Sequence, residues 1–594
     1  MDLHFTDAVA SAEEKTAIDG FVASLPAEGD RRQYLIETLH ATQDRIGWIS
    51  PGALNHTSKV LGVPPAEAYG VADFYALFST VERPPVVAHV CDDIGCMAKG
   101  AEKLCADLTA KLGPAGTSKD GHTTWHRSPC LGLCERAPVA LVVIAGKQPQ
   151  DHALAATTVA EIEKALQNKP VPEIQLKDSV PQFGQPGLQL LKRVGVVDPE
   201  SIDDYRAHGG FQAMRRAFEM GAEGVIREVT DSKLVGRGGA AFPTGMKWNS
   251  VRSQVSPRYL ICNADESEPG TFKDRVLMEG DPFALIESMT IAAFATGCEK
   301  GYIYIRGEYP LAKRRLEHAI QQCELRGFLG DNILGDGVKF HLELRRGAGA
   351  YICGEETALM NSLEGKRGEP RNKPPFPTQH GLFNMPTVIN NVETMMNVPL
   401  IILEGGKKFA AIGTEKSTGP KLFCVAGHVA KPGVYEAPFG ITLRQLLDMA
   451  GGVTGTMQAC LLGGAAGAFV GPKDIDVPLT FEGTRAIGAS LGSAVIMPFN
   501  ETVKLGGILH RISGFFRDES CGQCVPCRIG TVRQEELLQR LASGKSNGST
   551  KQELEILKEV GQCMRDASIC GLGQTASSAI ESALAKFPIF EEKY

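Results

Sequence analysis

The chain has 594 residues, about four times the length of a typical domain, so we expect three to five folded units rather than one. Its 43% hydrophobic and 22% charged residues exclude wholesale disorder. The 62 Lys and Arg against 69 Asp and Glu give a net charge of −7 with no basic block, which excludes an electrostatic nucleic-acid or membrane-surface partner.

No apolar run reaches the roughly 18 residues that a membrane span requires. The start, MDLHFTDAVASAEEK, is acidic and lacks the pattern of a signal peptide. We therefore expect a cytoplasmic protein without a membrane span. In that compartment the 16 cysteines should be buried thiols, metal ligands or redox groups rather than disulfides.

The first quarter of the chain predicts helices followed by a small α/β domain. Apolar residues recur at helical spacing over 31–80, so we predict a helical segment at 1–80. Short β runs at 86–90 and 139–144 flank a predicted helix at 98–112, which indicates an α/β domain at 81–150. The Pro- and Gln-rich stretch near 168–186 predicts a linker, bounded here at 151–199.

Two cysteine pairs lie in this small domain. Cys91 and Cys96 are separated by four residues, and Cys130 and Cys134 by three. Two pairs from two loops can grip a [2Fe–2S] cluster, each pair holding one iron. A zinc ion with four thiolate ligands is the alternative that this spacing leaves open.

The rest of the chain divides into three further predicted domains. Glycine-rich α/β sequence with strands at 259–262 and 302–305 fills 200–418. A β-rich stretch begins near 421 and predicts a compact domain at 419–502, and the helical pattern after it predicts a helical domain at 503–594. The expected fold class is therefore multidomain α/β.

A denser cysteine motif lies in the last predicted domain. Cys521, Cys524 and Cys527 have the C-x2-C-x2-C spacing that lets three thiolates of one loop reach three corners of a [4Fe–4S] cluster. For the fourth ligand we favour Cys570, in a glycine-flexible turn, over Cys563, in a helical pattern. A structural zinc site is the alternative, although such sites usually show two separated pairs.

Glycine-rich and acidic loops in the 200–418 domain predict a nucleotide site. The segment 236–245, GRGGAAFPTG, contains G-x-G-x-x-A, but the polar residues before it and Pro243 fit a Rossmann turn poorly. Its many amides still suit a phosphate, and Arg237 and Lys247 could add charge. The acidic run 263–274 directly after a strand, the second glycine loop at 345–356, and the segments KPPFP and NNVET complete the set. Together with the cysteine motifs, these loops predict nucleotide-linked electron transfer.

Several long phrases carry a family resemblance: GRGGAAFPTGMKW, CNADESEPGTFKD, GAGAYICGEET, KPPFP, NNVET and ESCGQCVPCRIGT. From about residue 200 onward the chain resembles the flavoprotein that carries FMN and binds NADH in respiratory NADH:quinone oxidoreductase, its 51 kDa subunit. The region before it resembles the thioredoxin-like [2Fe–2S] subunit of 24 kDa, here fused in front. Residues ~420–500 are similar to a β-grasp-like ligand-binding insert, and the C-terminus to a helical [4Fe–4S] domain.

The resemblance implies the cofactors FMN, NAD(H), one [4Fe–4S] and one [2Fe–2S], and a set of binding residues. The FMN set is Gly236, Arg237, Gly238, Gly239, Ala240, Gly245, Lys247, Asn263, Asp265, Gly354, Asn390, Asn391 and Thr394. The NADH set is Phe242, Glu268, Glu355, Glu356, Lys373 and Phe376, with Glu266 and Tyr351 as further cofactor-binding residues. Glu268 is expected near the nicotinamide. Two positions depart from the family pattern: Ala241 stands where Gly is usual, and Ser250 where some members have a second aromatic residue.

The implied chemistry is hydride transfer between nicotinamide and flavin, which needs no general acid or base from the protein. The tail CMRDASICGLGQTASSAI and the segment YRAHGGFQAMRRA look most like the β subunit of NAD-dependent molybdenum or tungsten formate dehydrogenase. The expected partner is then the metal-containing α subunit with further iron–sulfur clusters. The diaphorase subunit of an NAD-reducing nickel–iron hydrogenase and a fused NADH-input subunit of the respiratory enzyme are the alternatives. A zinc-binding scaffold that holds a regulatory nucleotide is the alternative from another class, and it would be colourless.

Overall fold

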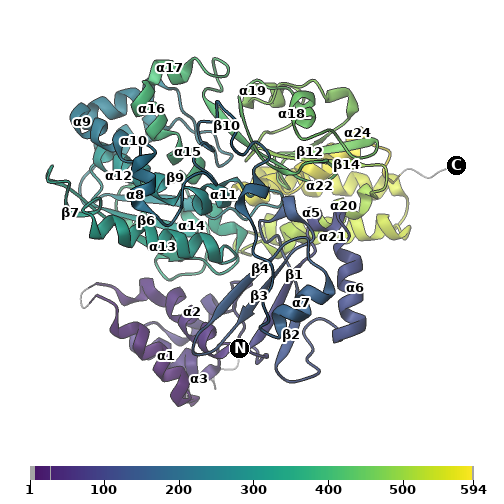
Figure 1. Cartoon of the computed structure of the whole chain (residues 1–594). Helices are drawn as coiled ribbons and strands as arrows, with labels where there is room; N and C mark the ends of the chain where they lie inside the picture. Colours follow the sequence, from purple (N-terminus) through teal and green to yellow (C-terminus); the bar gives the residue numbers. More distant parts are fainter. Residues whose placement is uncertain (1–6, 27–28, 591–594) are drawn as a thin grey trace.

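The computed structural model describes residues 7–26 and 29–590 (Figure 1). Residues 1–6, on which the expectation of a missing signal peptide partly rests, and 591–594, the end of the predicted helical domain, lie outside the described residues. Within the described ranges, every helix is too short or too polar to cross a lipid bilayer.

The described chain opens with helices, as the periodicity predicts. They are α1 (Ala12–Ala23), α2 (Leu35–Ile46), α3 (Pro51–Leu61) and α4 (Pro65–Ala72). The Ser11 and Ser50 hydroxyls cap α1 and α3, and Gly47 ends α2 in the left-handed conformation. Leu35 and Leu39 are fully buried in the main core of the molecule, so these helices pack against the other domains rather than standing apart.

A four-stranded sheet in the order β2-β1-β3-β4 comes next in the chain. Its strands are β1 (Val86–Cys91), β2 (Thr123–Ser128), β3 (Ala140–Ile144) and β4 (Gln150–Leu154), and its helices are α5 (Ile94–Ala98), α6 (Ala101–Leu112) and α7 (Val159–Leu166). Strand β1 pairs parallel with β2 and antiparallel with β3.

The sheet extends into the segment predicted as a linker. Strand β4 pairs with β3 in antiparallel register, and α7 packs on β3, so ordered structure of this domain runs past residue 150. Strand β4 reads QDHAL and lies at the sheet edge with only Leu154 buried. A short, polar edge strand carries little hydrophobic alternation, which is why the sequence pattern missed it.

The central domain is built on a sheet in the order β7-β8-β6-β5-β9. Its strands are β5 (Tyr259–Ala264), β6 (Lys300–Ile305), β7 (Gly330–Ile333), β8 (Val338–Arg346) and β9 (Thr387–Asn391). All neighbours pair in parallel except β7 and β8. Strands β5 and β9 therefore end at the same edge, where the acidic run and the NNVET segment leave the sheet.

Helices cover this sheet. They are α8 (Ile202–Ala207), α9 (Gln212–Asp231), α10 (Thr244–Arg252), α11 (Lys273–Gly280), α12 (Pro282–Thr296), α13 (Pro310–Leu325), α14 (Glu356–Leu363), α15 (Val392–Met396), α16 (Val398–Glu404) and α17 (Gly406–Ala410). The apolar helix α12 is almost wholly buried, as its sequence predicts. The first glycine turn joins α9 to α10 rather than a strand to a helix, which agrees with the poor fit to a Rossmann turn.

Residues 420–500 form a second five-stranded sheet in the order β11-β10-β14-β12-β13. Its strands are β10 (Pro420–Val425), β11 (Gly433–Pro438), β12 (Met457–Leu462), β13 (Ala468–Val470) and β14 (Val495–Asn500), with helices α18 (Leu443–Met449) and α19 (Phe481–Ala486). One face of this sheet has its own apolar core.

The chain ends in helices, shown in yellow-green and yellow in Figure 1: α20 (Leu505–Asp518), α21 (Val525–Ser543), α22 (Thr550–Ala567), α23 (Gly571–Thr575) and α24 (Ser578–Lys586). Helix α24 packs on β13 of the second five-stranded sheet, and α20 contacts α5 of the first domain. The last domain therefore bridges the 420–500 domain and the cysteine-bearing domain near the N-terminus.

Candidate functional site

A cavity of about 380 Å³ lies where β5 and β9 end. Of the residues predicted to bind a cofactor, those that line it are Gly238, Gly239, Ala240, Asn263, Asp265, Glu266, Glu268, Tyr351, Gly354, Glu355 and Asn391. They come from four loops that are far apart in the sequence. The topology therefore brings the two glycine loops, the acidic run and the NNVET segment to one place.

The remaining predicted residues surround the cavity without lining it: Gly236, Arg237, Phe242, Gly245, Lys247, Glu356, Lys373, Phe376, Asn390 and Thr394. Three of them fasten the glycine turn and α10 to the end of the sheet. Thr394 Oγ1 accepts from the Arg237 backbone N–H at 2.9 Å, and Lys247 Nζ donates to a β9 carbonyl at 2.8 Å. Asn390 Oδ1 accepts from the Trp248 indole at 2.9 Å.

A cationic and aromatic group adjoins the second glycine loop. Lys373 Nζ lies 2.8 Å from carboxylate oxygens of both Glu355 and Glu356, and Glu355 lines the cavity. Phe376 is 53% exposed and Phe242 is 50% exposed, so both rings have a free face. An exposed ring beside a cavity offers a surface on which a planar ligand can stack.

The first glycine turn is tightly packed. A Cβ built on Gly238 would lie 3.2 Å from Cβ of Asn391, and one on Gly245 would lie 2.4 Å from Oγ1 of Thr230. Gly239 has φ +115° and Ala241 has φ +52°, so the departure from glycine at 241 falls on a left-handed residue. The alanine methyl is thus accommodated at the cost of backbone strain.

Three carboxyl groups of the acidic run have raised pKa values. Burial raises the pKa of Asp265 to about 8 and that of Glu268 to about 7. Burial and the neighbouring Asp274 raise the pKa of Glu266 to about 7. Asp265 Oδ2 is buried and has no hydrogen-bond partner, so the cavity wall carries an acceptor that awaits a donor.

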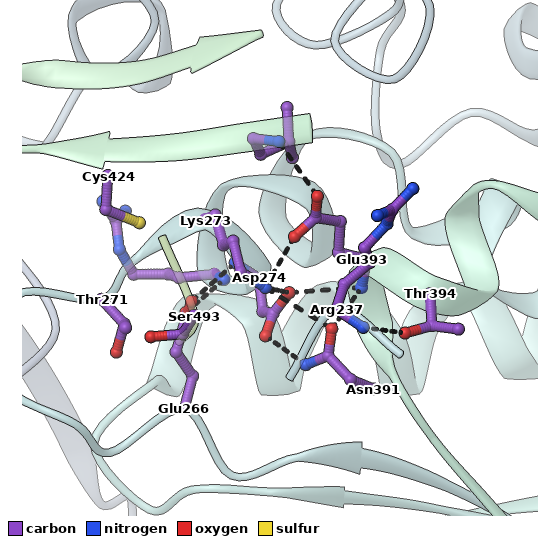
Figure 2. A network of polar contacts seen from close by, with 12 residues as sticks. Arg237, Glu266, Thr271, Lys273, Asp274, Asn391, Glu393, Thr394, Cys424 and Ser493 are labelled. Atoms are coloured by element: carbon purple, nitrogen blue, oxygen red, sulfur yellow. Dashed lines mark hydrogen bonds and ion pairs between the residues drawn. The ribbon is translucent and has the colours of Figure 1, made fainter. Parts of the chain in front are cut away.

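A buried charge network supports the cavity floor (Figure 2). Lys273 Nζ lies 2.8 Å from Asp274 Oδ1 and 3.0 Å from Glu393 Oε2, and Lys421 Nζ lies 2.6 Å from the same Glu393 oxygen. Asn391 donates to Asp274 Oδ2 at 2.6 Å. Burial lowers the pKa of Lys421 to about 8, whereas the two ammonium groups overcome burial and lower the pKa of Glu393 to about 2. Opposite charges therefore fix α11, α15 and β10 beneath the site.

The four cysteines of the first domain gather at one place. Cys130 Sγ lies 3.3 Å from Cys134 Sγ, and all four thiols are buried. Hydrogen bonds from Cys130 and Cys96 raise the pKa of Cys91, and hydrogen bonds to Cys134 and Cys91 lower the pKa of Cys130. The two pairs thus face each other, as a two-iron cluster would need.

The C-terminal cysteines form a second group. Burial raises the pKa of Cys527 to about 12, and the nearby Cys524, Cys570 and Cys521 contribute to that shift. Cys563 is exposed, whereas Cys570 is partly buried. Within the described residues, no three His, Cys, Asp or Glu side chains converge closely enough to hold a single metal ion.

Both cysteine groups adjoin the cavity. Gly571 and Leu572, which come directly after Cys570, line its wall. A second cavity, of about 340 Å³, is lined by Cys130 and shares Ser267 and Tyr351 with the first. The nucleotide site therefore lies between two thiol clusters.

Sequence reasoning missed other lining residues: Ser267, Thr271, Lys273, Asp274, Ile352, Gly463, Ala466, Ser490, Gly492, Ser493, Gly571, Leu572 and Thr575. Ser267, Lys273 and Asp274 stand within the acidic run, and Ile352 within the second glycine loop. The five from 463–493 belong to another domain, and their only signal is the run of glycines near 463 and 492.

Comparison with family models identifies each domain. Residues 229–400 match the Nuo51 FMN-binding domain, 18–168 the thioredoxin-like [2Fe-2S] ferredoxin, 507–593 the NADH-ubiquinone oxidoreductase-F iron-sulfur binding region, and 422–462 the SLBB domain. The fold class expected from the sequence is confirmed, and FMN and the two clusters are the cofactors of these domains.

Curated relatives match mainly the part after the first domain. The chain is 46% identical over 407 residues to the F subunit of NADH-quinone oxidoreductase of Aquifex aeolicus (strain VF5), covering 68% of this chain and 94% of that one. It is 43% identical to the HndC subunit of the NADP-reducing hydrogenase of Solidesulfovibrio fructosivorans, covering 67% and 81%. A solved NAD+-reducing [NiFe]-hydrogenase in the H2-reduced state has a TM-score of 0.79 and 33% identity, covering 94% of this chain and 91% of the other.

Proposed function

Because the chain belongs to the family of NADH-quinone oxidoreductase flavoproteins known as NuoF, we propose that it is the NAD(H)-oxidising subunit of a formate dehydrogenase. The family match carries the coarser statement: the chain is an FMN- and iron–sulfur-dependent NAD(H) oxidoreductase subunit. The finer statement, that formate is the electron donor, is ours.

The described residues fit an FMN and a dinucleotide. A cavity of about 380 Å³ lies within the range of roughly 300–1,000 Å³ that small-molecule sites occupy. Backbone amides of the crowded turn at Gly238 and Gly239 suit a phosphate, and the unpartnered Asp265 Oδ2 suits a ligand donor. When bound, FMN takes a hydride from NADH as an electron pair and releases electrons one at a time.

The protein's own contribution is binding and orientation. We assign Phe242 and Phe376 to stacking on the adenine and Lys373 to the dinucleotide beside Glu355 and Glu356. Glu268 faces the cavity near the nicotinamide. With its pKa raised to about 7 by burial, Glu268 is partly neutral at physiological pH, which lowers the repulsion of the anionic cofactors.

The observation that carries the electron-transfer function is the position of both thiol groups beside one cavity. We assign Cys521, Cys524, Cys527 and Cys570 to [4Fe–4S] and Cys91, Cys96, Cys130 and Cys134 to [2Fe–2S]. Residues Gly571 and Leu572 join Cys570 to the cavity wall, and Cys130 lines the adjoining cavity. A short protein path on both sides suits exchange of single electrons.

Formate as the donor is supported by the two segments that resemble formate dehydrogenase β subunits, CMRDASICGLGQTASSAI and YRAHGGFQAMRRA. The partner would then be an α subunit with molybdenum or tungsten and further clusters. A diaphorase role in an NAD-reducing hydrogenase is the second candidate, favoured by the solved hydrogenase that covers 94% of this chain. We propose the cytoplasm as the location, because all 16 cysteines are free thiols.

Purification of the natural complex tests the donor. We expect a molybdenum- or tungsten-containing subunit to co-purify, and formate to drive reduction of NAD+. Nickel in the complex together with H2-driven reduction of NAD+ would instead establish the hydrogenase. A colourless protein that contains zinc and does not oxidise NADH would remove the proposal altogether.

A further inference from the structure

One wall of the nucleotide cavity comes from the 420–500 domain. Gly463 and Ala466 line it from the turn after β12, and Ser490, Gly492 and Ser493 line it from the turn before β14. Neither the sequence motifs nor the FMN-binding family model, which ends at residue 400, includes these residues.

This wall holds the carboxylate of Glu268 at both oxygens. The Ala466 backbone N–H donates to Oε1 at 3.0 Å, and the Ser493 hydroxyl donates to Oε2 at 3.2 Å. Glu268 itself leaves the central sheet after β5. A side chain of one domain is therefore oriented by two donors of another.

Steric packing fixes the same contact. Gly464 has φ +82°, and a Cβ built on it would lie 2.5 Å from Cδ of Glu268. The carboxylate thus rests directly against the backbone of this turn. Only glycine allows that approach in the left-handed conformation.

We propose that Ser493 is a positioning residue for nicotinamide nucleotide binding: with the Ala466 amide, its hydroxyl holds the Glu268 carboxylate at the cavity. The 420–500 domain then takes part in dinucleotide binding and is more than a spacer. This inference rests on the proposed function, because it requires NAD(H) to enter this cavity.

Charge and protonation agree with this role. Burial raises the pKa of Glu268 to about 7, and the bonds from Ala466 and Ser493 act in the opposite direction by stabilising the carboxylate. Tyr351, on the 3-10 turn Tyr351–Gly354, is the titratable group that faces Glu268, and burial keeps its pKa well above the ordinary value. Tyr351 therefore stays neutral while Glu268 titrates.

The test compares two serine variants in the intact chain loaded with FMN and clusters. Ser493→Ala removes the bond to Glu268. Ser417→Ala is the matched control, because Ser417 Oγ bonds Glu482 at 2.6 Å in the same part of the chain and does not line the cavity. Calorimetric titration with NAD+ gives affinity, and NADH oxidation with an artificial acceptor gives KM and kcat across pH.

We expect Ser493→Ala to weaken NAD+ binding and raise the KM for NADH by roughly tenfold, the size expected for one hydrogen bond to a charged group. The value of kcat should change little. The inflection in KM near neutral pH should move to higher pH, because one group that stabilises the carboxylate is lost. Ser493→Thr should restore wild-type values, and Ser417→Ala should keep them.

Gly464→Ala gives a second, independent variant. It displaces the same carboxylate without removing the hydroxyl, so it should also raise KM. Wild-type affinity and pH profile in both Ser493→Ala and Gly464→Ala, or an equal loss in Ser417→Ala, would overturn the inference and leave the proposed function standing. A wild-type chain that binds FMN but no NAD+ would overturn both.

Discussion

At the scale of single residues, the two half-exposed phenylalanines distinguish binding of NADH from binding of FMN. Phe242 and Phe376 lie outside the lining of the cavity, and each presents a free ring face. An aromatic stack adds about 0.5–1.5 kcal/mol beyond simple burial. Their loss should therefore change affinity for the dinucleotide and leave the flavin in place.

We expect Phe376→Ala to raise the KM for NADH by roughly 2- to 12-fold, the factor that this stacking energy gives. Flavin content should stay at one per chain, measured by absorbance after release. Phe183→Ala is the control, because Phe183 is also an exposed phenylalanine but lies elsewhere. Loss of flavin with unchanged affinity for NADH would show that our division of the pocket is wrong.

Ala241 gives a prediction about stability. An alanine at φ +52° carries strain that glycine avoids, so Ala241→Gly should raise the free energy of unfolding by about 1 kcal/mol. Ala240→Gly, at the neighbouring position with an ordinary φ, should give no gain. Denaturant unfolding of the two variants makes the comparison. A destabilised Ala241→Gly variant would mean that the methyl contributes packing that outweighs the strain.

At the scale of elements, sequence patterns found the strands with continuous apolar runs. Strands β1, β5 and β6 are buried over most of their length, and their Val, Ile and Tyr residues announce them. Strands β2 and β4 are polar and went unrecognised. Four of the site's loops were found because each carries glycines or acids at a strand end. The wall from the 420–500 domain was not, because pairing between distant turns leaves no local pattern.

The turn between α22 and α23 determines the fourth cluster ligand. We expect Cys570→Ser to abolish the paramagnetic signal of the reduced [4Fe–4S] cluster and to lower iron content by up to four per chain. Cys563→Ser should keep both, because Cys563 is exposed on α22. Electron paramagnetic resonance of the dithionite-reduced protein and iron analysis provide the readouts. The reverse pattern would move the ligand to Cys563.

The buried network between α15 and β10 makes stability depend on pH. The two ammonium groups lower the pKa of Glu393 from 4.5 to about 2 despite burial. Its contribution to stability is therefore complete above the unfolded-state pKa of about 4.5 and is lost as the pH falls toward 2. Lys421→Met leaves a buried charge with one partner fewer, and it should cost about 3–5 kcal/mol at pH 7.

Urea unfolding between pH 7 and 3 checks this expectation. The wild type should lose stability below pH 4.5 more steeply than Lys421→Met. Lys313→Met removes an exposed pair with Glu317 and should cost at most about 1 kcal/mol. An equally small cost for Lys421→Met would show that the network contributes little to folding.

At the scale of the whole molecule, two arginines of the central domain reach into the [2Fe–2S] domain. Arg306 donates to the carbonyls of Cys130 and Glu266, at 2.5 and 2.7 Å, so one side chain contacts both sites. Arg275 bonds Glu135 at 2.5 Å, and both side chains are almost fully buried. The geometry between the two sites thus depends on buried charge across a domain boundary.

We expect Glu135→Gln to destabilise this boundary by about 1.5–3 kcal/mol, because Arg275 keeps Glu279 as a partner. Hydrogen exchange should quicken around 130–136 and 273–280 and stay unchanged in β10 to β14. Glu102→Gln, at an exposed pair inside the first domain, is the control. Unchanged exchange in Glu135→Gln would show that apolar packing alone holds the boundary.

The covalent path from α7 to α8 has a further consequence. Curated relatives of the NuoF type cover only about two thirds of this chain, whereas here the thioredoxin-like unit and the flavin unit share one polypeptide. A tether of this kind sustains an effective local concentration of about millimolar, so docking becomes independent of dilution. One thioredoxin-like unit accompanies each flavin unit by construction, and synthesis of a single message sets that ratio.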